Sequence, residues 1–353
     1  MSPAFHITAT SSLTPYGIGA QAYLHGSQQG KPSTKDIAGS YTVKPQMAFV
    51  PDYDAQKLLA VRSVSNFDRL TLHVCVAVDQ LHQQLGFDDL ALRREKLADD
   101  RMGIVLGCAG PLQSIVDFDL QTIEEPSYVQ PSKVPNLVFN VPASYAAIRH
   151  GIRGSCITLT DGDSSSLKAF AVAAGQLEFG RIDLAMVGGA EEATPAYAMF
   201  RQAMDKSELE RASPIAEGAA LFALETAQHA KAAGRQSLAG LYGCVQLFSP
   251  QDRQAGLNAC VEKLRRQHPS AMREIEVVYC DSECDLTQLQ LLTSAPVRLN
   301  ERLGRAGAMY GSLALLDALT SPTVAEGAHL LILQADEAGT CVAGLFQKRA
   351  QLN

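Results

Sequence analysis

The sequence predicts a globular α/β protein with a large core, and three of its features together indicate this. Short apolar runs of strand length alternate along the chain with longer segments whose apolar residues recur at helical spacing. The composition, with 46% hydrophobic and 19% charged residues, is that of a globular protein. The length of 353 residues allows a large buried core. Such alternation is typical of helices packed on sheets.

The expected elements can be placed along the chain by these patterns. Strands are expected at residues 5–9, 103–106, 156–160, 184–187, 219–224, 241–248, 276–280, 329–334 and 341–346. Helices are expected at residues 65–85, 142–150, 164–179, 193–204, 251–267 and 307–319. The last of these helices has glycine, alanine and serine on nearly every side, so we expect it in the centre of the protein, where small side chains allow close packing.

The charge balance and the cysteines exclude several classes of protein. The 30 Lys and Arg residues against 37 Asp and Glu residues give a net charge of −7 without a long basic run, so no nucleic-acid partner is expected. We expect a cytoplasmic protein without membrane insertion, because neither a signal peptide nor a membrane-spanning apolar run is visible. The eight cysteines are scattered, and Cys280 and Cys284 lack a second ligand pair, so neither a disulfide framework nor a metal site is expected. No cofactor is expected, since Gly17 and Gly19 lack the third glycine of a dinucleotide-binding turn.

Two stretches of the chain are built alike. A helix that begins at Asp163 leads to a strand and to the acidic turn at residues 190–192. A helix that begins at Arg305 leads likewise to a strand and to the acidic turn at residues 335–337, and one further strand follows in each case. This echo predicts two similar halves, residues 1–229 and 238–353, packed as one integrated unit.

Several segments resemble the β-ketoacyl synthase family. Residues 154–169 (GSCITLTDGDSSSLKA) resemble the family's nucleophile region, where a strand runs into a sharp turn, a cysteine and a helix start rich in small residues. The resemblance extends to residues 66–69, 101–107, 183–191 and 217–219, and it is strongest from Pro135 to Glu225. It implies a thiolase-like fold, in which two similar halves form two mixed sheets within five α/β layers (αβαβα).

The resemblance also identifies the positions of the family's catalytic residues. Family members load the acyl chain on a cysteine thiolate at a helix N-terminus, and two histidines polarise the malonyl thioester. By this register the cysteine position holds Asp163, and the histidine positions hold Asp281 and Arg305. An aspartate is a poor nucleophile toward a thioester, and an arginine stays protonated and cannot act as a neutral imidazole. We therefore expect a degenerate site without catalytic residues.

Asp163 keeps three alternative interpretations. The favoured one is an N-cap, because aspartate is among the best capping residues. Positioning of a ligand and a direct catalytic role remain open beside it. If the register is right, Asp163, Asp281 and Arg305 meet in a charge-compensated cluster. The loops that line the acyl entrance in active family members are contracted here, at residues 206–214 and 338–341.

A non-catalytic member of this family implies a catalytic partner. The resemblance is to the chain length factor, the inactive subunit that pairs with an active ketosynthase in type II polyketide synthases, possibly of the aryl-polyene kind. It implies a heterodimer through the edge strand from Cys156 to Thr160, contact with acyl carrier protein through the complex, and residues 111–144 reaching across the interface. Two alternatives to this heterodimer remain. The first is a self-standing thiolase-superfamily enzyme that acts on acyl thioesters by other chemistry, such as hydrolysis through Asp163. The second is a homodimeric scaffold that binds acyl carrier protein.

Overall fold

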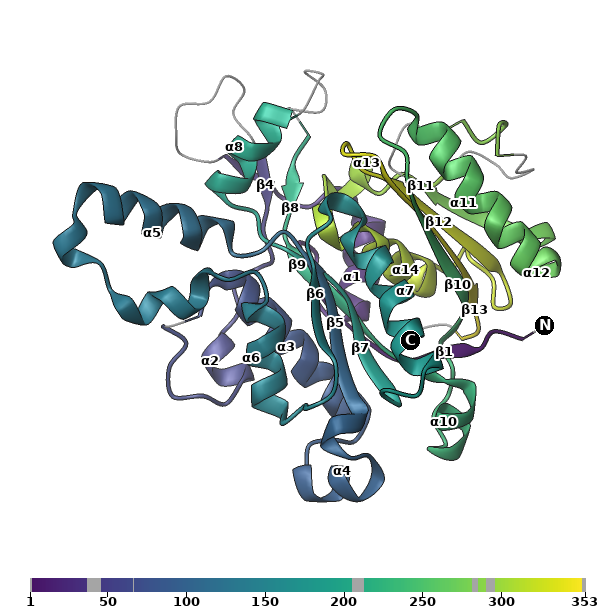
Figure 1. The fold of residues 1–353 in the computed structure, drawn as a ribbon, viewed down its shortest axis with the longest axis horizontal. Helices are drawn as coiled ribbons and strands as arrows, with labels where there is room; N and C mark the ends of the chain where they lie inside the picture. The colour runs from purple at the N-terminus through teal and green to yellow at the C-terminus, as the bar shows by residue number, and fades with distance from the viewer. Residues whose placement is uncertain are drawn as a thin grey trace.

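The fold is layered, with helices on both sides of two sheet halves and between them (Figure 1). A computed structural model describes residues 2–36, 46–65, 67–204, 213–280, 285–289 and 296–350. Asp281, one of the three degenerate positions, lies outside the described residues. Within the described ranges, every helix is too short or too polar to cross a membrane.

The first sheet half carries the strands on which the candidate site is built. Its strands lie in the order β1 (Phe5–Thr14), β9 (Gly218–Thr226), β7 (Leu184–Glu191), β5 (Met102–Cys108) and β6 (Cys156–Leu159). The short β2 (Gly17–Ile18) pairs with β1. Strands β7, β5 and β6 are parallel to one another, and β9 is antiparallel to both of its neighbours. Strand β6 therefore ends the sheet, as expected for an edge strand.

The second sheet half continues from the first. Its strands lie in the order β10 (Ala239–Phe248), β13 (Thr340–Lys348), β12 (His329–Ala335) and β11 (Ile275–Cys280). Residues 5–7 of β1 pair with residues 239–241 of β10, so one continuous sheet forms where two separate sheets were expected. The pairing is only three residues long, and the two halves diverge beyond it to enclose a helical layer.

Three helical layers complete the five-layered arrangement. The central layer is α7 (Ser165–Glu178) and α14 (Tyr310–Thr320), whose side chains share one core with both sheet halves. On the outer face of the first half lie α3 (Arg69–Gln84) and α6 (Val141–His150). On the outer face of the second half lie α11 (Arg253–Gln267) and α12 (Pro269–Arg273). All eleven residues of α14 are buried, which confirms the central position expected from its small side chains.

Smaller elements decorate these layers. The other helices are α1 (Ala20–Gln29), α2 (Ala55–Leu58), α4 (Leu90–Lys96), α5 (Leu112–Glu124), α8 (Pro195–Met204), α10 (Ala227–Ala232) and α13 (Asn300–Leu303). A small sheet contains β3 (Lys35–Asp36), β4 (Gln46–Ala48) and β8 (Ile215–Ala216). The helix expected from residue 65 begins instead at Arg69, because the carboxylate of Asp68 accepts a hydrogen bond from the Thr71 N–H and caps the helix there.

Aromatic side chains join the two sheet halves through the central layer. Phe170 of α7 is fully buried, and its ring lies edge-on to Phe346 of β13 with the centroids 5.5 Å apart. The same ring lies 5.8 Å from that of Phe222 on β9. One side chain thus contacts both halves, and we expect its loss to affect the whole fold.

Replacing Phe170 by alanine should lower the free energy of unfolding by about 3–5 kcal/mol, because it leaves a cavity between two packed sheets. Urea unfolding of the purified chain measures this. Phe179, just past the end of the same helix, is 76% exposed, and Phe179→Ala is the matched control with an expected change within about 0.5 kcal/mol. Similar losses for the two variants would contradict the bridging role of Phe170.

Candidate functional site

The candidate site forms where the starts of α7 and α14 meet. Ser166, near the beginning of α7, accepts a hydrogen bond from the Ser312 N–H of α14 at 3.3 Å. Glycines permit the close approach of both helix starts: a Cβ on Gly107 of β5 would collide with the backbone of α7. A Cβ on Gly189 of β7 would lie 2.5 Å from the Ser166 Cβ and 2.8 Å from the carbonyl oxygen of Ala308, in the turn before α14. Only glycine permits this approach, so the two helix starts and the turns before them share one small region.

Asp163 lies in the turn that precedes α7. A 3-10 turn (Gly162–Ser164) separates β6 from the helix, and Gly162 adopts a positive φ of 65° there. Ser164 occupies the capping position of α7, and no side chain caps the helix, so the N-cap prediction for Asp163 was wrong. Asp163 lies within this added turn, one residue before the N-cap position. Its backbone carbonyl instead accepts a hydrogen bond from Gln334 Nε2 at 2.5 Å.

The Asp163 carboxylate faces two arginines. Arg305 Nη2 lies 3.7 Å from Asp163 Oδ2, and Arg201 Nη1 lies 3.7 Å from Asp163 Oδ1. Glu337, in the turn between β12 and β13, completes the cluster: its Oε1 is 3.1 Å from Arg201 Nη2 and 3.8 Å from Arg305 Nη2. Two cations and two carboxylates therefore alternate. The structure brings Asp163 and Arg305 together as expected, while the role of Asp281 stays a prediction.

Arg201 and Glu337 were not predicted as site residues, although the sequence contains a signal for each. Arg201 follows Tyr197 by four residues on α8, so it shares the buried face of that helix, and its side chain is 9% exposed. Glu337 belongs to the acidic turn that echoes residues 190–192. Neither signal says that the two residues meet, because that contact depends on how the two halves pack.

The two similar acidic turns, at residues 190–192 and 335–337, also contribute carboxyl groups close to the site. Glu191, at the end of β7, is 1% exposed, and its Oε2 accepts a hydrogen bond from the Ala308 N–H at 3.0 Å. Burial, with a smaller contribution from the nearby charge of Asp163, raises the pKa of this carboxyl to about 8. Asp336 accepts hydrogen bonds from the Gly339 and Thr340 N–H groups and from the Ser164 hydroxyl.

A cavity of about 220 Å³ opens beside the cluster. Asp163, Glu191 and Arg201 form its polar end. The rest of its wall is mainly apolar or aromatic and consists of Ala109, Leu112, Phe139, Thr160, Gly162, Tyr197 and Phe200. Phe139 and Phe200 are 44% and 53% exposed, so the cavity reaches the surface between them.

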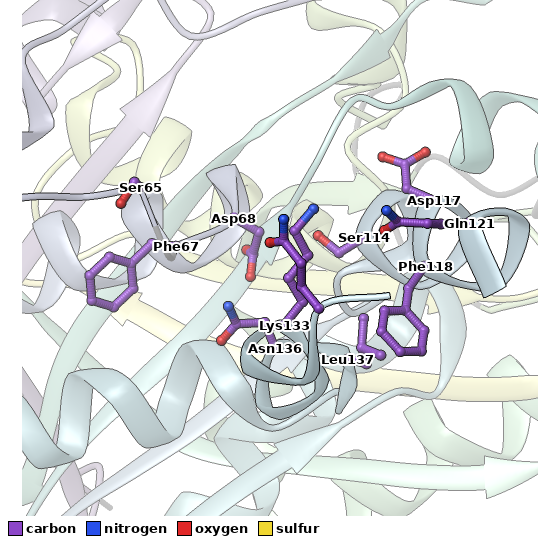
Figure 2. A pocket seen from close by; sticks show the side chains of 11 residues that line it. Ser65, Phe67, Asp68, Ser114, Asp117, Phe118, Gln121, Lys133, Asn136 and Leu137 are labelled. Atoms are coloured by element: carbon purple, nitrogen blue, oxygen red, sulfur yellow. The ribbon is translucent and has the colours of Figure 1, made fainter. Parts of the chain in front are cut away.

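A second hollow, of about 400 Å³, lies beneath α5 and is polar (Figure 2). Its floor contains Phe67 and Asp68, at the start of α3. Its other walls are formed by α5 and by the 3-10 helix η3 (Pro131–Leu137), which contribute Ser114, Asp117, Phe118, Gln121, Lys133, Asn136 and Leu137. Of the predicted catalytic positions, the two that the structure describes, Asp163 and Arg305, do not line this hollow.

The paired groups limit the chemistry of the cluster. A carboxylate held between two guanidinium groups is a weak nucleophile, and arginine neither donates nor accepts a proton near neutral pH. Among the described members of the cluster there is neither a thiol nor an imidazole. The nearby thiol of Cys108 is buried, which raises its pKa to about 12 and keeps it protonated.

Comparison with known proteins identifies the family. A family model described as "Beta-ketoacyl synthase, N-terminal domain" matches residues 24–230, which is more than half of the chain. The chain belongs to the β-ketoacyl synthase family. Similar curated relatives are the 3-oxoacyl-(acyl-carrier-protein) synthases 2 of Vibrio cholerae serotype O1 and Vibrio harveyi, each 24% identical over 258 residues. The aligned region covers 67% of this chain but only 61% of each relative, so the chain spans less than two thirds of their length.

Solved structures of this family resemble the whole chain. The structure described as "The ishigamide ketosynthase/chain length factor" is 25% identical, with a TM-score of 0.81 over 98% of this chain and 100% of that one. A β-ketoacyl synthase from Burkholderia phymatum has a TM-score of 0.84 at 15% identity over 98% and 99% of the two chains. A type II PKS acyl-carrier protein complex with its ketosynthase has a TM-score of 0.75 at 19% identity over the same shares. This full-length likeness confirms the thiolase-like fold.

Arg201 should contribute to stability through its two carboxylate partners. Replacing it by methionine leaves Glu337 and Asp163 with Arg305 as the remaining cation of this cluster, so the free energy of unfolding should fall by about 1–3 kcal/mol. Arg153→Met is the control, because the Arg153 side chain is 75% exposed and 4.0 Å from Asp99, and it should change stability by less than about 0.5 kcal/mol. Denaturant unfolding measures both, and equal stabilities would contradict a cohesive cluster.

The carboxyl of Glu191 should make the protein less stable as the pH rises. Its pKa lies near 4.5 in the unfolded chain and near 8 in the folded one, so the folded state binds the proton more tightly. Stability from this proton is complete below about pH 4.5 and is lost as the pH rises through about 8. Between these values the group should lower the free energy of unfolding by up to about 1.4 kcal/mol per pH unit.

Glu191→Gln tests this dependence. The glutamine keeps an oxygen for the Ala308 N–H but does not titrate, so its stability should fall less between about pH 5 and pH 9 than that of the unchanged chain. Urea unfolding at a series of pH values gives both curves. Parallel curves would show that Glu191 is already ionised at neutral pH.

Proposed function

We propose that this chain is a non-catalytic, chain-length-factor subunit that pairs with an active β-ketoacyl synthase in type II polyketide or fatty-acid-like biosynthesis. The observation that carries the proposal is Asp163: a carboxylate paired with Arg201 and Arg305 stands where the family's register places the acyl-accepting cysteine. Family condensation needs a thiolate and two imidazoles, and this cluster supplies neither. Condensation is therefore assigned to the partner subunit.

The edge strand β6 supports a partner on this side of the molecule. In the described part of the chain β6 pairs on one side, with β5, and its other edge is open. Cys156 is exposed, and Ile157, Thr158 and Leu159 are half-buried. An open edge that carries apolar residues invites pairing with another chain. A partner strand added here would extend the sheet and cover these side chains.

Helix α5 supports the same partner, because it exposes a row of apolar side chains. Its apolar residues Val116, Leu120 and Ile123 lie on one face and are 39%, 49% and 76% exposed. Another face of the helix, with Asp117, Phe118 and Gln121, lines the hollow against the protein's own body (Figure 2). A helix normally buries its apolar face in its own core. The apolar face of α5, which is uncovered in the isolated chain, is thus suited to contact with a partner protein.

Other exposed apolar side chains continue this surface. Tyr128, Val134 and Val138, which follow α5 along the chain, are 71%, 48% and 53% exposed, and Ile148 of α6 is 76% exposed. Helix α6 contacts both β6 and η3, and η3 contacts α5, so the open edge and the outward helix belong to one side of the molecule. An apolar patch of this kind marks an interaction surface.

The partner's identity and the role of the cavity follow from the family. The description of the ishigamide structure names a ketosynthase and a chain length factor, which supports a heterodimer with a ketosynthase. Leu112 of α5 and the partly exposed Phe139 and Phe200 line the 220 Å³ cavity, so a partner docked on α5 would lie next to it. We assign to this chain the shaping of the partner's acyl or polyene cavity, with acyl carrier protein bound through the complex and an aryl-polyene pathway as the finer assignment.

Co-expression with a ketosynthase encoded beside this chain tests the proposal. The unchanged chain should co-purify with it in a one-to-one complex. Leu120→Asp with Ile123→Asp should abolish co-purification without lowering the melting temperature of the isolated chain, because both side chains are exposed. Phe248→Asp is the matched control, since Phe248 is 68% exposed at the end of β10 and should leave the complex intact.

Two other outcomes would contradict the proposal. A covalently attached acyl group on the isolated chain during turnover, or thioester hydrolysis that is lost on Asp163→Ala, would support a self-standing enzyme. A stable homodimer that binds acyl carrier protein and excludes the ketosynthase would support a scaffold.

A further inference from the structure

We propose that residues 111–140, here named the arm, dock electrostatically on a basic surface of the partner subunit. The arm contains α5, the 3-10 helix η2 (Pro126–Tyr128) and η3, and it projects from the body of the protein (Figure 1). The inference rests on the proposed pairing with a ketosynthase and adds the chemistry by which the two subunits recognise each other.

The arm concentrates the negative charge of the chain. It contains the four acidic residues Asp117, Asp119, Glu124 and Glu125 and the single basic residue Lys133, which gives a net charge of 1 − 4 = −3. The whole chain carries −7, so these 30 of 353 residues hold nearly half of the net charge. All five side chains are exposed. Such an asymmetry indicates an interaction with a surface of opposite charge.

The four carboxylates form no ion pair with other described residues of the protein. Within the described ranges none of them lies in an ion pair, whereas carboxylates elsewhere, such as Asp79, Asp99 and Asp183, are paired with arginines. Asp117 accepts a hydrogen bond from Gln113 one turn earlier, which leaves its charge uncompensated. A charge left free on a projecting segment is available to another molecule.

The placement of two of these charges also works against the helix that carries them. Glu124 is the last residue of α5 and Glu125 follows it as the C-cap, and the last turn contains no basic residue. Carboxylates are unfavourable at a helix C-terminus, where the backbone carbonyls already present negative charge. The first turn, where they would stabilise the helix, contains no acidic residue. The charges therefore weaken α5 in isolation, and a basic partner surface would reverse that effect.

Two of the acidic residues border the apolar face of α5. Asp119 follows Val116 by three residues and Glu124 follows Leu120 by four, so a partner that covers the apolar face also meets these two carboxylates. Asp117 lies on the other side, where it lines the hollow together with Asp68 (Figure 2). An apolar centre with a charged border is the usual anatomy of a protein interface, in which border charges raise the association rate and fix the orientation.

A variant without the four negative charges of the arm tests the electrostatic inference separately from the proposed pairing with a ketosynthase. The test variant carries Asp117→Asn, Asp119→Asn, Glu124→Gln and Glu125→Gln. The control carries Asp88→Asn, Glu95→Gln, Glu274→Gln and Glu276→Gln, which remove the same charge from exposed positions at α4 and in the second half, away from the arm. Binding to the purified ketosynthase is measured by surface plasmon resonance at low and at high salt.

The arm variant should associate about ten-fold more slowly at low salt and lose most of its salt dependence, while the control behaves like the unchanged chain. The melting temperature of the arm variant should be equal or higher, since α5 loses unfavourable charges. Unchanged association rates in a complex that still forms would overturn the electrostatic inference alone. Failure of the unchanged chain to bind the ketosynthase at either salt concentration would overturn the proposed pairing as well.

Discussion

The close packing of the two central helices against glycine-lined strands is the constraint on which the site depends. Ser164, Ser165 and Ser166 at the start of α7 are fully buried, and the starts of α7 and α14 approach each other closely enough for a backbone N–H of one to reach a side chain of the other. Interiors packed at this density do not deform continuously. The turns before both helices are therefore held in one place, and Asp163 and Arg305 face each other although 142 positions separate them in the sequence.

The charges in this region are arranged for compensation. Asp163 and Glu337 each lie near both Arg201 and Arg305, which offsets part of the desolvation that either sign would suffer alone. Glu191 is almost fully buried and does not carry the cost of a buried charge, because its raised pKa keeps it largely protonated near neutral pH. A reactive thiolate needs the opposite conditions, with an uncompensated positive potential and an open path to the substrate. If Asp163 occupies the family's nucleophile position, as the predicted register has it, one fold position serves either a nucleophile or an ion-pair cluster, according to the side chains that occupy it.

The sequence predicted the regular elements well and the contacts between them less well. Alternating patterns located the strands of both halves, and the small residues of α14 correctly placed it in the centre, because both signals are local. The capping role of Asp163 was wrong, because Gly162 adopts a positive φ and starts an extra turn that no periodicity reveals. Helix α5 was not predicted, although its apolar residues Val116, Leu120 and Ile123 recur at helical spacing. The sequence alone could not show that these side chains stay exposed in the isolated chain.

The exposed apolar face of α5 lies close to the candidate site, because Leu112 of the same helix lines the cavity beside Asp163. Under the proposed non-catalytic role, this cavity has no acyl-loading function of its own. The open edge of β6 and the apolar face of α5 belong to the same side, and leaving both uncovered would invite unselective aggregation. A partner of matching shape removes both liabilities and lies next to the cavity. Charges on the arm would then select which partner binds, because apolar contact alone discriminates poorly between surfaces of similar shape.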